Sequence, residues 1–177
     1  MNLSRKIILI SGAPGSGKTT LAKPLAKRLN FALISKDFIK ETLADKLELD
    51  YLDLKVNRKI GGASMETMWK LARYSPQVIL EANFRPHSEY ERERIKSLNG
   101  QIIELYCKCS NEEVKRRFAE RAKTKTHHPV HFFKELPTEL LAEYDQPVGI
   151  GKVIEINTEK PVDIEETANK INELWVE

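Results

Sequence analysis

Residues 12–19, Gly-Ala-Pro-Gly-Ser-Gly-Lys-Thr, place three glycines ahead of a lysine and a threonine, between an apolar run and a leucine-striped segment. This order matches G-x-x-x-x-G-K-[ST], in which the glycines let successive backbone N–H groups point inward around phosphate oxygens. In such a segment Lys18 reaches the β- and γ-phosphates and the Thr19 hydroxyl ligates Mg²⁺. We therefore predict a nucleoside triphosphate site with Lys18 as a catalytic cation. Its nucleotide-binding residues are Gly12, Ala13, Pro14, Gly15, Ser16, Gly17, Lys18, Thr19 and Thr20.

This segment does not fix the destination of the γ-phosphoryl group, so signatures elsewhere in the chain must decide it. Guanine-specific switches carry N-K-x-D, and the nearest stretch, residues 157–160 (NTEK), does not match it. Motor ATPases generally carry an apolar strand that ends in Asp-Glu, whereas the stretch VILEAN holds a single acid, Glu81. These differences favour transfer of the phosphoryl group to an acceptor.

Asp37 lies in the stretch SKDFIK, just after a second short apolar run. In open parallel sheets ligands bind outside the carboxyl ends of the strands, so this carboxylate is expected near the phosphate site. There it would accept the proton of an attacking hydroxyl as a general base. An aspartate also commonly caps a helix, here one over residues 38–45, and the spacing leaves both interpretations open.

A third polar group lies in the stretch LEANFRP. Glu81, at a predicted strand end, would hold Mg²⁺ through water or position the acceptor. Asn83 and Arg85 come next in the loop, and we assign both to substrate binding. For Arg85, a salt bridge across strand ends is the competing interpretation.

Six of the eleven residues from 115 to 125 are basic, and two of them, Arg117 and Arg121, are four positions apart. Side chains at this spacing share one helix face, so the two guanidinium groups would clamp the transferring phosphoryl group or stack on adenine. A solvated charged face is the usual alternative for such a run.

The polar segment that follows favours a lid over residues 122–137, which would keep water away from the reacting phosphoryl group. It contains His127, His128 and His131. No matching set of cysteines or carboxylates surrounds these histidines in the sequence, so we interpret them as lid surface and not as metal ligands.

The elements that position these groups are five short apolar segments, which alternate with stretches of helical period. Runs of Ile, Leu or Val on successive positions are typical of parallel strands buried on both faces. The pattern predicts an α/β fold with a parallel sheet, in one domain over residues 1–177. Capping boxes predict two helix starts, Ser110 with Glu113 and, more weakly, Asp163 with Glu166. The predicted strands are Lys6–Ser11, Phe31–Ser35, Gln77–Ala82, Gln101–Cys107 and Lys152–Ile156.

The connection over residues 37–76 is far longer than a simple crossover between parallel strands needs. It holds Asn57 and Arg58 among other polar and aromatic residues, and a Gly61-Gly62 break ahead of a Met- and Trp-striped helix. We assign this connection to acceptor binding, because its mixture of aromatic, amide and cationic groups suits a polar or phosphorylated metabolite.

Taken in order along the chain, these motifs resemble the small P-loop kinases related to polynucleotide 5′-kinases, zeta-toxin kinases and chloramphenicol phosphotransferase. The resemblance rests on GAPGSGKTT, on Asp37, on the acid and the amide in LEANF, and on the Arg117/Arg121 pair. It implies a three-layer P-loop fold, with a five-stranded parallel sheet of order 2-3-1-4-5, helices on both faces and a lid. It also implies ATP as the donor, with Mg²⁺.

The same resemblance implies roles for single residues. Asp37 would be the base and the lid arginines would bind the phosphates. Lys40 stands where polynucleotide kinases hold a substrate phosphate with a basic residue, although a lysine lacks the bidentate fork of an arginine. Glu81 stands where those kinases tend to have Asp, and the loop over residues 157–161 falls where they pass the adenine ring.

Composition sets few limits on function. Hydrophobic residues make up 41% of the chain and charged residues 31%, and the net charge of +3 gives no general affinity for nucleic acid or membrane. No apolar stretch approaches the length of a membrane span, and the two cysteines show no metal-site spacing. We expect a cytoplasmic protein, a monomer or homodimer, with no membrane partner and no long nucleic acid partner.

The prediction is therefore an ATP-dependent kinase that phosphorylates a hydroxyl of a small-molecule acceptor. Two alternatives stay open. One is a nucleotide or polynucleotide 5′-hydroxyl kinase, and the other is an ATP-binding regulatory protein that has no acceptor.

Overall fold

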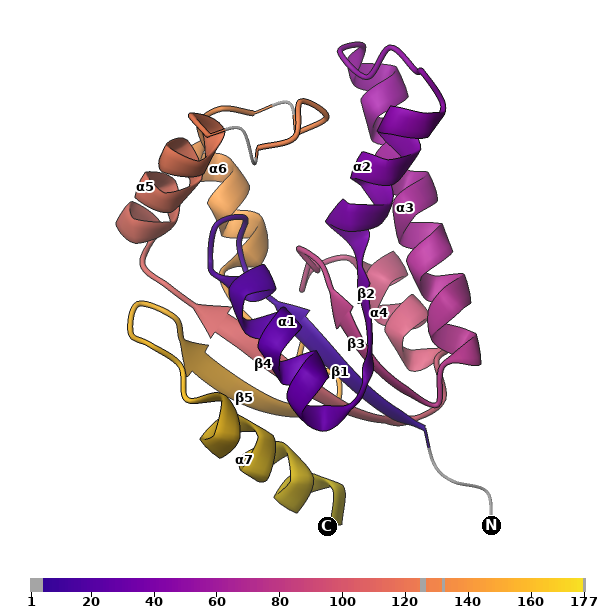
Figure 1. Ribbon diagram of the computed structural model, residues 1–177, viewed down its shortest axis with the longest axis vertical. Helices are drawn as coiled ribbons and strands as arrows, with labels where there is room; N and C mark the ends of the chain where they lie inside the picture. Colours follow the sequence, from indigo (N-terminus) through magenta and orange to yellow (C-terminus); the bar gives the residue numbers. More distant parts are fainter. Residues whose placement is uncertain (1–4, 125–126, 132, 177) are drawn as a thin grey trace.

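The computed structural model describes residues 5–124, 127–131 and 133–176, in which strands and helices alternate along the chain (Figure 1). The strands are β1 (Lys6–Ser11), β2 (Ala32–Ser35), β3 (Gln77–Glu81), β4 (Gln101–Lys108) and β5 (Lys152–Asn157). The helices are α1 (Lys18–Leu29), α2 (Lys36–Lys46), α3 (Leu54–Tyr74), α4 (Glu89–Lys96), α5 (Asn111–Ala122), α6 (Thr138–Leu141), the 3₁₀ turn η1 (Ala142–Tyr144) and α7 (Ile164–Val176).

The five strands form one sheet of order β2-β3-β1-β4-β5, and every neighbouring pair is parallel. This confirms the predicted fold class and strand order. β1 lies at the centre, with Ile8 opposite Ile79 of β3 and Ile103 of β4. Ile7–Ile10 are fully buried, which explains why the apolar residues of this strand run consecutively instead of alternating.

Helices cover both faces of the sheet and divide the core into two layers (Figure 1). Ile8 and Ile10 pack with α1 and α7 on one face, whereas Ile7 and Leu9 pack with α3 and α4 on the other. β1 is therefore packed from both sides, and the loop that follows Ser11 begins at the buried centre of the sheet.

The predicted strand limits are correct for β1 and differ by one residue at one end for the others. β4 and β5 each extend one residue further, because Lys108 and Asn157 continue their pairing. β3 ends at Glu81, and β2 begins at Ala32, where it pairs with Val78.

The two predicted capping boxes have different outcomes. At the start of α7 the N–H of Glu166 donates to Asp163 Oδ1 at 2.9 Å, which confirms the predicted cap. At the start of α5 the predicted helix start is confirmed, because Ser110 is the N-cap residue, but the capping box is absent, because the Ser110 side chain accepts no capping hydrogen bond. Glu113 instead forms an ion pair with Arg117 at 2.6 Å, and this pairing competes with the reciprocal bond of a capping box.

α2 and α3 pack together as a long helical hairpin that rises beyond the β2 edge of the sheet (Figure 1). The predicted break at Gly61-Gly62 is wrong, since both glycines lie within the continuous helix α3. The predicted acceptor region over residues 37–76 is this hairpin. On the opposite side α5 and α6 form a second arm. No helix in the described part of the chain is long and apolar enough to cross a membrane.

Candidate active site

The loop between β1 and α1 is tightly curled. Gly12 and Gly15 have φ values of 128° and 87°, in the region that favours glycine. A Cβ at Gly12 would lie 2.7 Å from the carbonyl oxygen of Cys107, and one at Gly15 would lie 3.0 Å from that of Val114. The loop therefore needs glycine both for its backbone conformation and for its close approach to β4 and α5.

Lys18, the first residue of α1, is only 6% exposed. Its Nζ donates to the carbonyl oxygens of Gly12 at 2.9 Å and Ala13 at 2.6 Å, so the loop curls around the ammonium group. Burial lowers the pKa of Lys18, while the charges of Glu81 and Asp37 work in the opposite direction. The arrangement holds one cation at the centre of the curled backbone, as phosphate binding requires.

Thr19 and Glu81 meet where α1 begins and β3 ends. Thr19 Oγ1 donates to Glu81 Oε1 at 2.9 Å, and the other carboxylate oxygen, Oε2, is buried without a partner among the described residues. A hydroxyl and a carboxylate with an unused oxygen are ligands that Mg²⁺ prefers, with its other positions left to water and phosphate. These two residues fit the ion, as predicted, and would hold it against the phosphates.

Asp37 lies in the first turn of α2, and the cap of this helix is Ser35, whose Oγ accepts a backbone N–H of that turn at 3.5 Å. The interpretation of Asp37 as a helix cap is therefore wrong. Lys36 Nζ lies 2.9 Å from Asp37 Oδ1. Burial opposes ionisation, but the positive charges of Lys36 and Lys18, together with His131 in its protonated form, hold the pKa of Asp37 well below its usual range. The group is a carboxylate at every physiological pH.

Arg117 and Arg121 both lie on the wall of a cavity of about 580 Å³, which also contains Lys18, Asp37 and Glu81. Arg117 is held by Glu113 and by the carbonyl oxygen of Thr158 at 3.0 Å, and Arg121 lies over the ring of Phe118.

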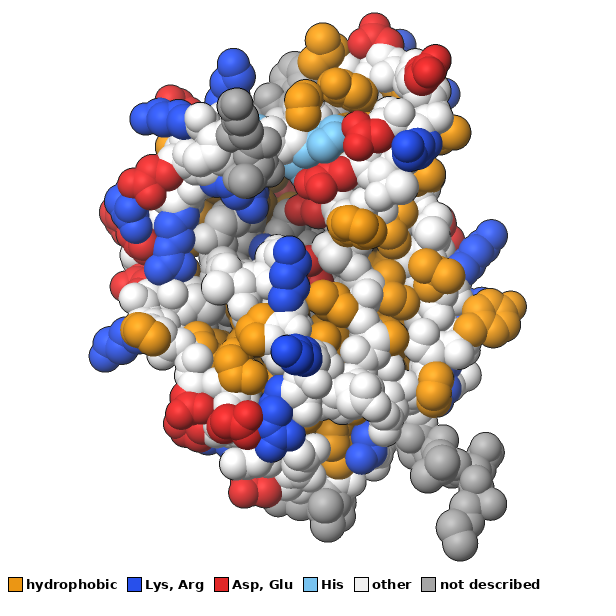
Figure 2. Space-filling model, in the orientation of Figure 1, with side chains coloured by type: hydrophobic (Ala, Val, Ile, Leu, Met, Phe, Trp, Pro, Cys, Tyr) orange, Lys and Arg blue, Asp and Glu red, His pale blue; other side chains and the backbone are white. Residues whose placement is uncertain are grey.

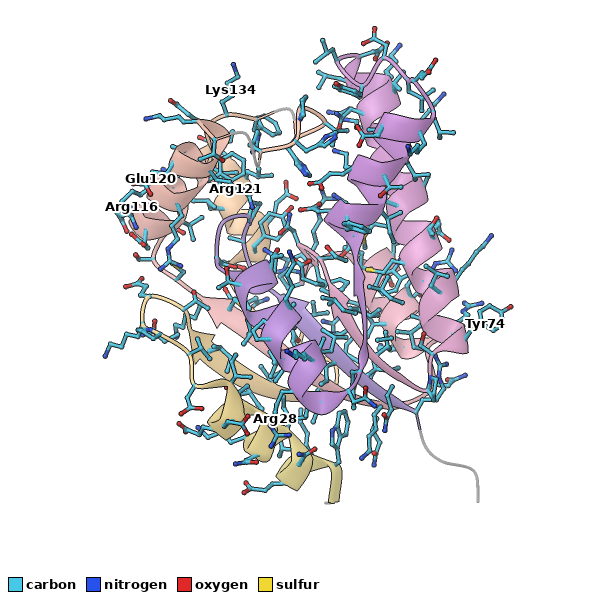
Figure 3. All side chains as sticks on the ribbon, in the orientation of Figure 1. Arg28, Tyr74, Arg116, Glu120, Arg121 and Lys134 are labelled. Carbon is cyan, nitrogen blue, oxygen red and sulfur yellow. The ribbon has the colours of Figure 1, made fainter. Side chains whose placement is uncertain are left out.

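The alternative of a solvated charged face holds for a different part of α5. Arg116 is paired with Glu113 and Glu120 in two exposed ion pairs. Figure 3 shows Arg116 and Glu120 on the outer side of α5, whereas Arg121 lies on the side of the cleft. One helix thus has a solvated face and a face toward the cavity.

The far end of the same cavity is formed by the loop after β5. Its lining residues there are Thr158, Lys160, Pro161, Val162 and Ile164. This loop includes the predicted adenine segment, residues 157–161, and its apolar members provide a surface for a flat ring.

A second cavity, of about 640 Å³, lies between the hairpin, the loop after β3 and η1. It contains all three predicted substrate-binding residues, Lys40, Asn83 and Arg85. Asn83 lines both cavities, so the two spaces adjoin. Lys36 and Arg58 add two more cations to the second cavity, and one acid, Glu91, faces them.

Lys40 is 8% exposed, and its Nζ donates to Asn57 Oδ1 at 2.7 Å and to the carbonyl oxygen of Val130 at 3.3 Å. Burial, together with the charge of Lys36, lowers the pKa of Lys40 to about 8. Asn57 also donates to Val130, at 2.8 Å. The second cavity is therefore joined to the predicted lid through Val130.

The structure shows the competing salt bridge of Arg85, and substrate binding by this residue stays a prediction. Its Nε lies 2.8 Å from Glu143 Oε2, which is the competing salt bridge. Its backbone N–H donates to Glu91 Oε2 at 2.9 Å, and its side chain still lines the second cavity. Glu91 and Tyr144 are site residues that the sequence analysis missed. The stretch Ser88–Glu91 is a capping-box pattern that could have located α4, but nothing in the sequence connects Tyr144 with the hairpin.

Two histidines of the predicted lid, His128 and His131, point toward α2. His131 Nε2 lies 2.7 Å from Glu41 Oε1, and His128 Nε2 lies 3.0 Å from Asp45 Oδ1. Figure 2 shows histidine and acidic side chains close together above the cleft. The interpretation as plain lid surface is therefore too simple, since these two residues dock the segment onto α2. Within the predicted lid, residues 125–126 and 132 lie outside the described residues.

Comparison with known proteins gives the family. Residues 7–144 match the AAA_33 family model, an AAA domain. The chain belongs to this family. Among curated proteins it is similar to the cytidylate kinase of Sulfurisphaera tokodaii, with 37% identity over 81 residues, 44% of this chain and 45% of the relative. With that of Pyrobaculum islandicum it shares 45% identity over 47 residues, 27% of this chain and 26% of the relative. The matches span less than half the length of these relatives.

Among solved structures the chain is similar to a protein of Chloroflexus aurantiacus assigned as a kinase, with a TM-score of 0.84 and 25% identity, over 96% of this chain and 98% of that one. The shikimate kinase of Bacteroides thetaiotaomicron has a TM-score of 0.59 and 19% identity, over 98% and 99% of the two chains, a likeness of fold alone. The chain thus has the fold of the small P-loop kinases. The narrower likeness to polynucleotide 5′-kinases, zeta-toxin kinases and chloramphenicol phosphotransferase stays a prediction.

Proposed function

We propose that this protein is an ATP-dependent phosphotransferase that binds ATP and Mg²⁺ in the first cavity and a small anionic acceptor in the second. The observation that carries the proposal is the junction of the two cavities. Asn83 lines both, and the Lys36–Asp37 ion pair contributes one residue to each. An acceptor in the second cavity would therefore reach the γ-phosphoryl group next to a carboxylate.

Each residue of the first cavity has a role in such a transfer. Lys18 would bind the β- and γ-phosphates, and Thr19 with Glu81 would hold Mg²⁺, which supplies positive charge to the phosphate oxygens. Arg117 and Arg121 would bind the negative charge of the transferring group from the side of α5. The loop over residues 157–161 would hold the adenine ring.

The chemistry at the junction follows from the state of Asp37. An acceptor hydroxyl attacks the γ-phosphorus, the bond to the β–γ bridging oxygen breaks, and ADP leaves. The hydroxyl proton goes to the Asp37 carboxylate, which is ionised and so free to accept it. Such a base acts by proximity and orientation more than by basicity.

The positive charge of the second cavity supports an anionic acceptor. Lys36, Lys40, Arg58 and Arg85 line it against the single acid Glu91. Cations that converge on one space attract an anion and fix its orientation. A phosphate or carboxylate on the acceptor would occupy this space.

A second candidate has a specific observation in its favour. The curated relatives are cytidylate kinases, so the accepting group would be the phosphate of a nucleoside monophosphate and the product a diphosphate. A phosphate oxygen has no proton to lose at neutral pH, so Asp37 would then orient Lys36 instead of acting as a base.

Acceptor-dependent release of ADP tests the proposal. The protein, Mg²⁺ and ATP are incubated with anionic metabolites that carry a hydroxyl, with the four nucleoside monophosphates, or with a 5′-hydroxyl oligonucleotide. We expect one acceptor class to raise ADP release well above the background with water, and ³¹P NMR of the product to separate a phosphate ester from a diphosphate. Intact ATP binding with no acceptor effect would contradict the proposal and favour the regulatory alternative.

A further inference from the structure

Two adjacent glycines, Gly61 and Gly62, lie in the middle of the 21-residue helix α3. Neither has a positive φ, so the backbone conformation does not require glycine. A Cβ built at either position meets no atom within 4 Å beyond the helix's own backbone, so packing does not require glycine either. Each glycine costs a helix about 1 kcal/mol relative to alanine. The fold alone gives no reason for this pair.

Both glycines line the second cavity. On the same helix face, Arg58 lies one turn before them and Met65 one turn after, and both of these residues line the cavity too. Tyr90 and Tyr144 contribute aromatic groups to the same space. The wall at the glycines is thus bare helix backbone, with a cation at one end and a thioether at the other.

The chemistry of this wall selects among ligands. The backbone N–H and C=O groups in the middle of a helix are already hydrogen-bonded to one another, so they offer no partners to sugar hydroxyls. What remains is a flat apolar surface of Cα atoms. Such a surface fits the face of a planar ring, and thioether and tyrosine side chains also pack well against rings.

Among the described residues, Arg58 is the cavity cation that has no hydrogen-bond or ion-pair partner. Lys36 is paired with Asp37, Lys40 donates to a side-chain amide, and Arg85 is paired with an acid. The Arg58 side chain is exposed and has no hydrogen bond or ion pair to another described residue. A ligand ring on the glycines would therefore place an adjoining anionic group within reach of an unpaired guanidinium.

We propose that Gly61 and Gly62 are specificity-determining residues that seat a planar ring of the acceptor, with the acceptor's anionic group at Arg58. This inference rests on the proposed function, because it concerns the acceptor of that reaction. It identifies the acceptor as an anion with a planar ring, such as a nucleotide or an aromatic phosphate, and not as a simple sugar phosphate.

The test compares ligands with and without a planar ring, because the furanose ring of ribose 5-phosphate is puckered and not aromatic. Binding is measured by calorimetry on the protein loaded with Mg²⁺ and a non-hydrolysable ATP analogue. The probes are the four nucleoside 5′-monophosphates, phenyl phosphate and ribose 5-phosphate. We expect the wild type to bind at least one planar-ring probe about tenfold more tightly than ribose 5-phosphate. The nucleotides and phenyl phosphate separate a nucleobase from any other aromatic ring.

The variants Gly61→Ala and Gly62→Ala then separate a ligand role from a structural one. Alanine suits a helix better, so the thermal midpoint should rise by about 2–4 °C. The added methyl group would stand where the ring lies, so the dissociation constant of the planar-ring probe should rise about tenfold. Binding of ribose 5-phosphate should stay unchanged. The bulkier Gly62→Leu should remove the preference for a ring altogether.

Ala63→Gly is the matched control, since Ala63 is exposed on the same helix and outside the cavity lining. It should lower the thermal midpoint and leave the affinity for every probe unchanged. Provided that the ATP analogue still binds, either of two results would overturn this inference. One is a lower thermal midpoint in the two alanine variants, and the other is an unchanged preference of these variants for planar-ring probes over ribose 5-phosphate. Failure of the wild type to bind the ATP analogue would instead overturn the proposed function, and this inference with it.

Discussion

One wall of the first cavity comes from a single segment of the chain, within residues 14–21, whereas the second cavity is assembled from four separate parts of the chain. In the first, the backbone of the loop surrounds the ammonium group of Lys18, and β4 and α5 lie in close contact with the loop glycines. In the second, the groups are side chains on α2, α3, η1 and the stretch from the loop after β3 into α4, together with the bare backbone at Gly61 and Gly62. The comparison suggests that the donor is fixed by local sequence and the acceptor by tertiary assembly.

Replacing Lys18 is expected to have the largest effect, and it acts on the donor side. In Lys18→Ala the curled loop loses the ammonium group that its carbonyls surround, so ATP affinity and phosphoryl transfer should both fall, the transfer by at least about 10³-fold. Calorimetry with Mg²⁺ and ATP, and ADP release with the best acceptor, measure the two effects. Lys27→Ala, an exposed lysine on the same helix, should change neither. ATP binding that survives in Lys18→Ala would refute the assignment of the first cavity to phosphate.

Replacing Asp37 is expected to lower the rate of phosphoryl transfer without weakening ATP binding, and so to distinguish the roles of the two cavities. Asp37→Asn keeps the shape of the side chain and removes its charge, so transfer to a hydroxyl should fall by about a hundred- to a thousandfold. ATP affinity should change little, because Lys18 and the loop stay in place. Single-turnover kinetics measure the transfer rate, and calorimetry on the same sample measures the ATP affinity. A retained transfer rate would exclude the role of general base and favour a phosphate acceptor.

The curled loop between β1 and α1 could be predicted from the sequence because its determinants are contiguous. Glycine, lysine and threonine at fixed spacing define the loop before any tertiary contact is known, and the consecutive apolar residues of β1 identify a doubly buried strand. The acceptor side depends on contacts across long sequence separations, such as Lys40 with Val130. Two adjacent glycines were interpreted as a break, because propensity alone cannot show that a helix of 21 residues tolerates them.

A third prediction tests the charge of the acceptor side through pH. The pKa of Lys40 is lowered to about 8 by burial and the charge of Lys36, so this residue loses its proton as pH rises through 8. Its attraction for an anionic acceptor is then lost, and the acceptor KM should rise about tenfold between pH 7 and pH 9. Steady-state kinetics with varied acceptor at saturating ATP measure this change.

The matched variant is Lys40→Arg, which stays protonated over the same range. Its acceptor KM should be nearly constant from pH 7 to pH 9, and its thermal midpoint shows whether the larger side chain is accommodated. A wild-type KM that does not change with pH, or the same rise in both proteins, would show that Lys40 does not attract the acceptor through its charge.

The smallest expected effect comes from Glu143, which pairs with Arg85 at the exposed rim of the second cavity. Exposed ion pairs contribute about 0.2–1 kcal/mol, so freeing Arg85 by Glu143→Gln should tighten acceptor binding by no more than about two- to fivefold. The control is Glu155→Gln, which breaks a similar exposed pair, with Lys108, outside the lining of both cavities. Acceptor affinity should rise in Glu143→Gln but not in Glu155→Gln, and ATP affinity should rise in neither variant. Added salt should reduce the gain in acceptor affinity. If Glu143→Gln instead weakens acceptor binding, the ion pair orients Arg85 for the ligand. The second cavity would then depend on side chains that are held in place before the ligand binds, just as the loop of the first cavity depends on its fixed backbone.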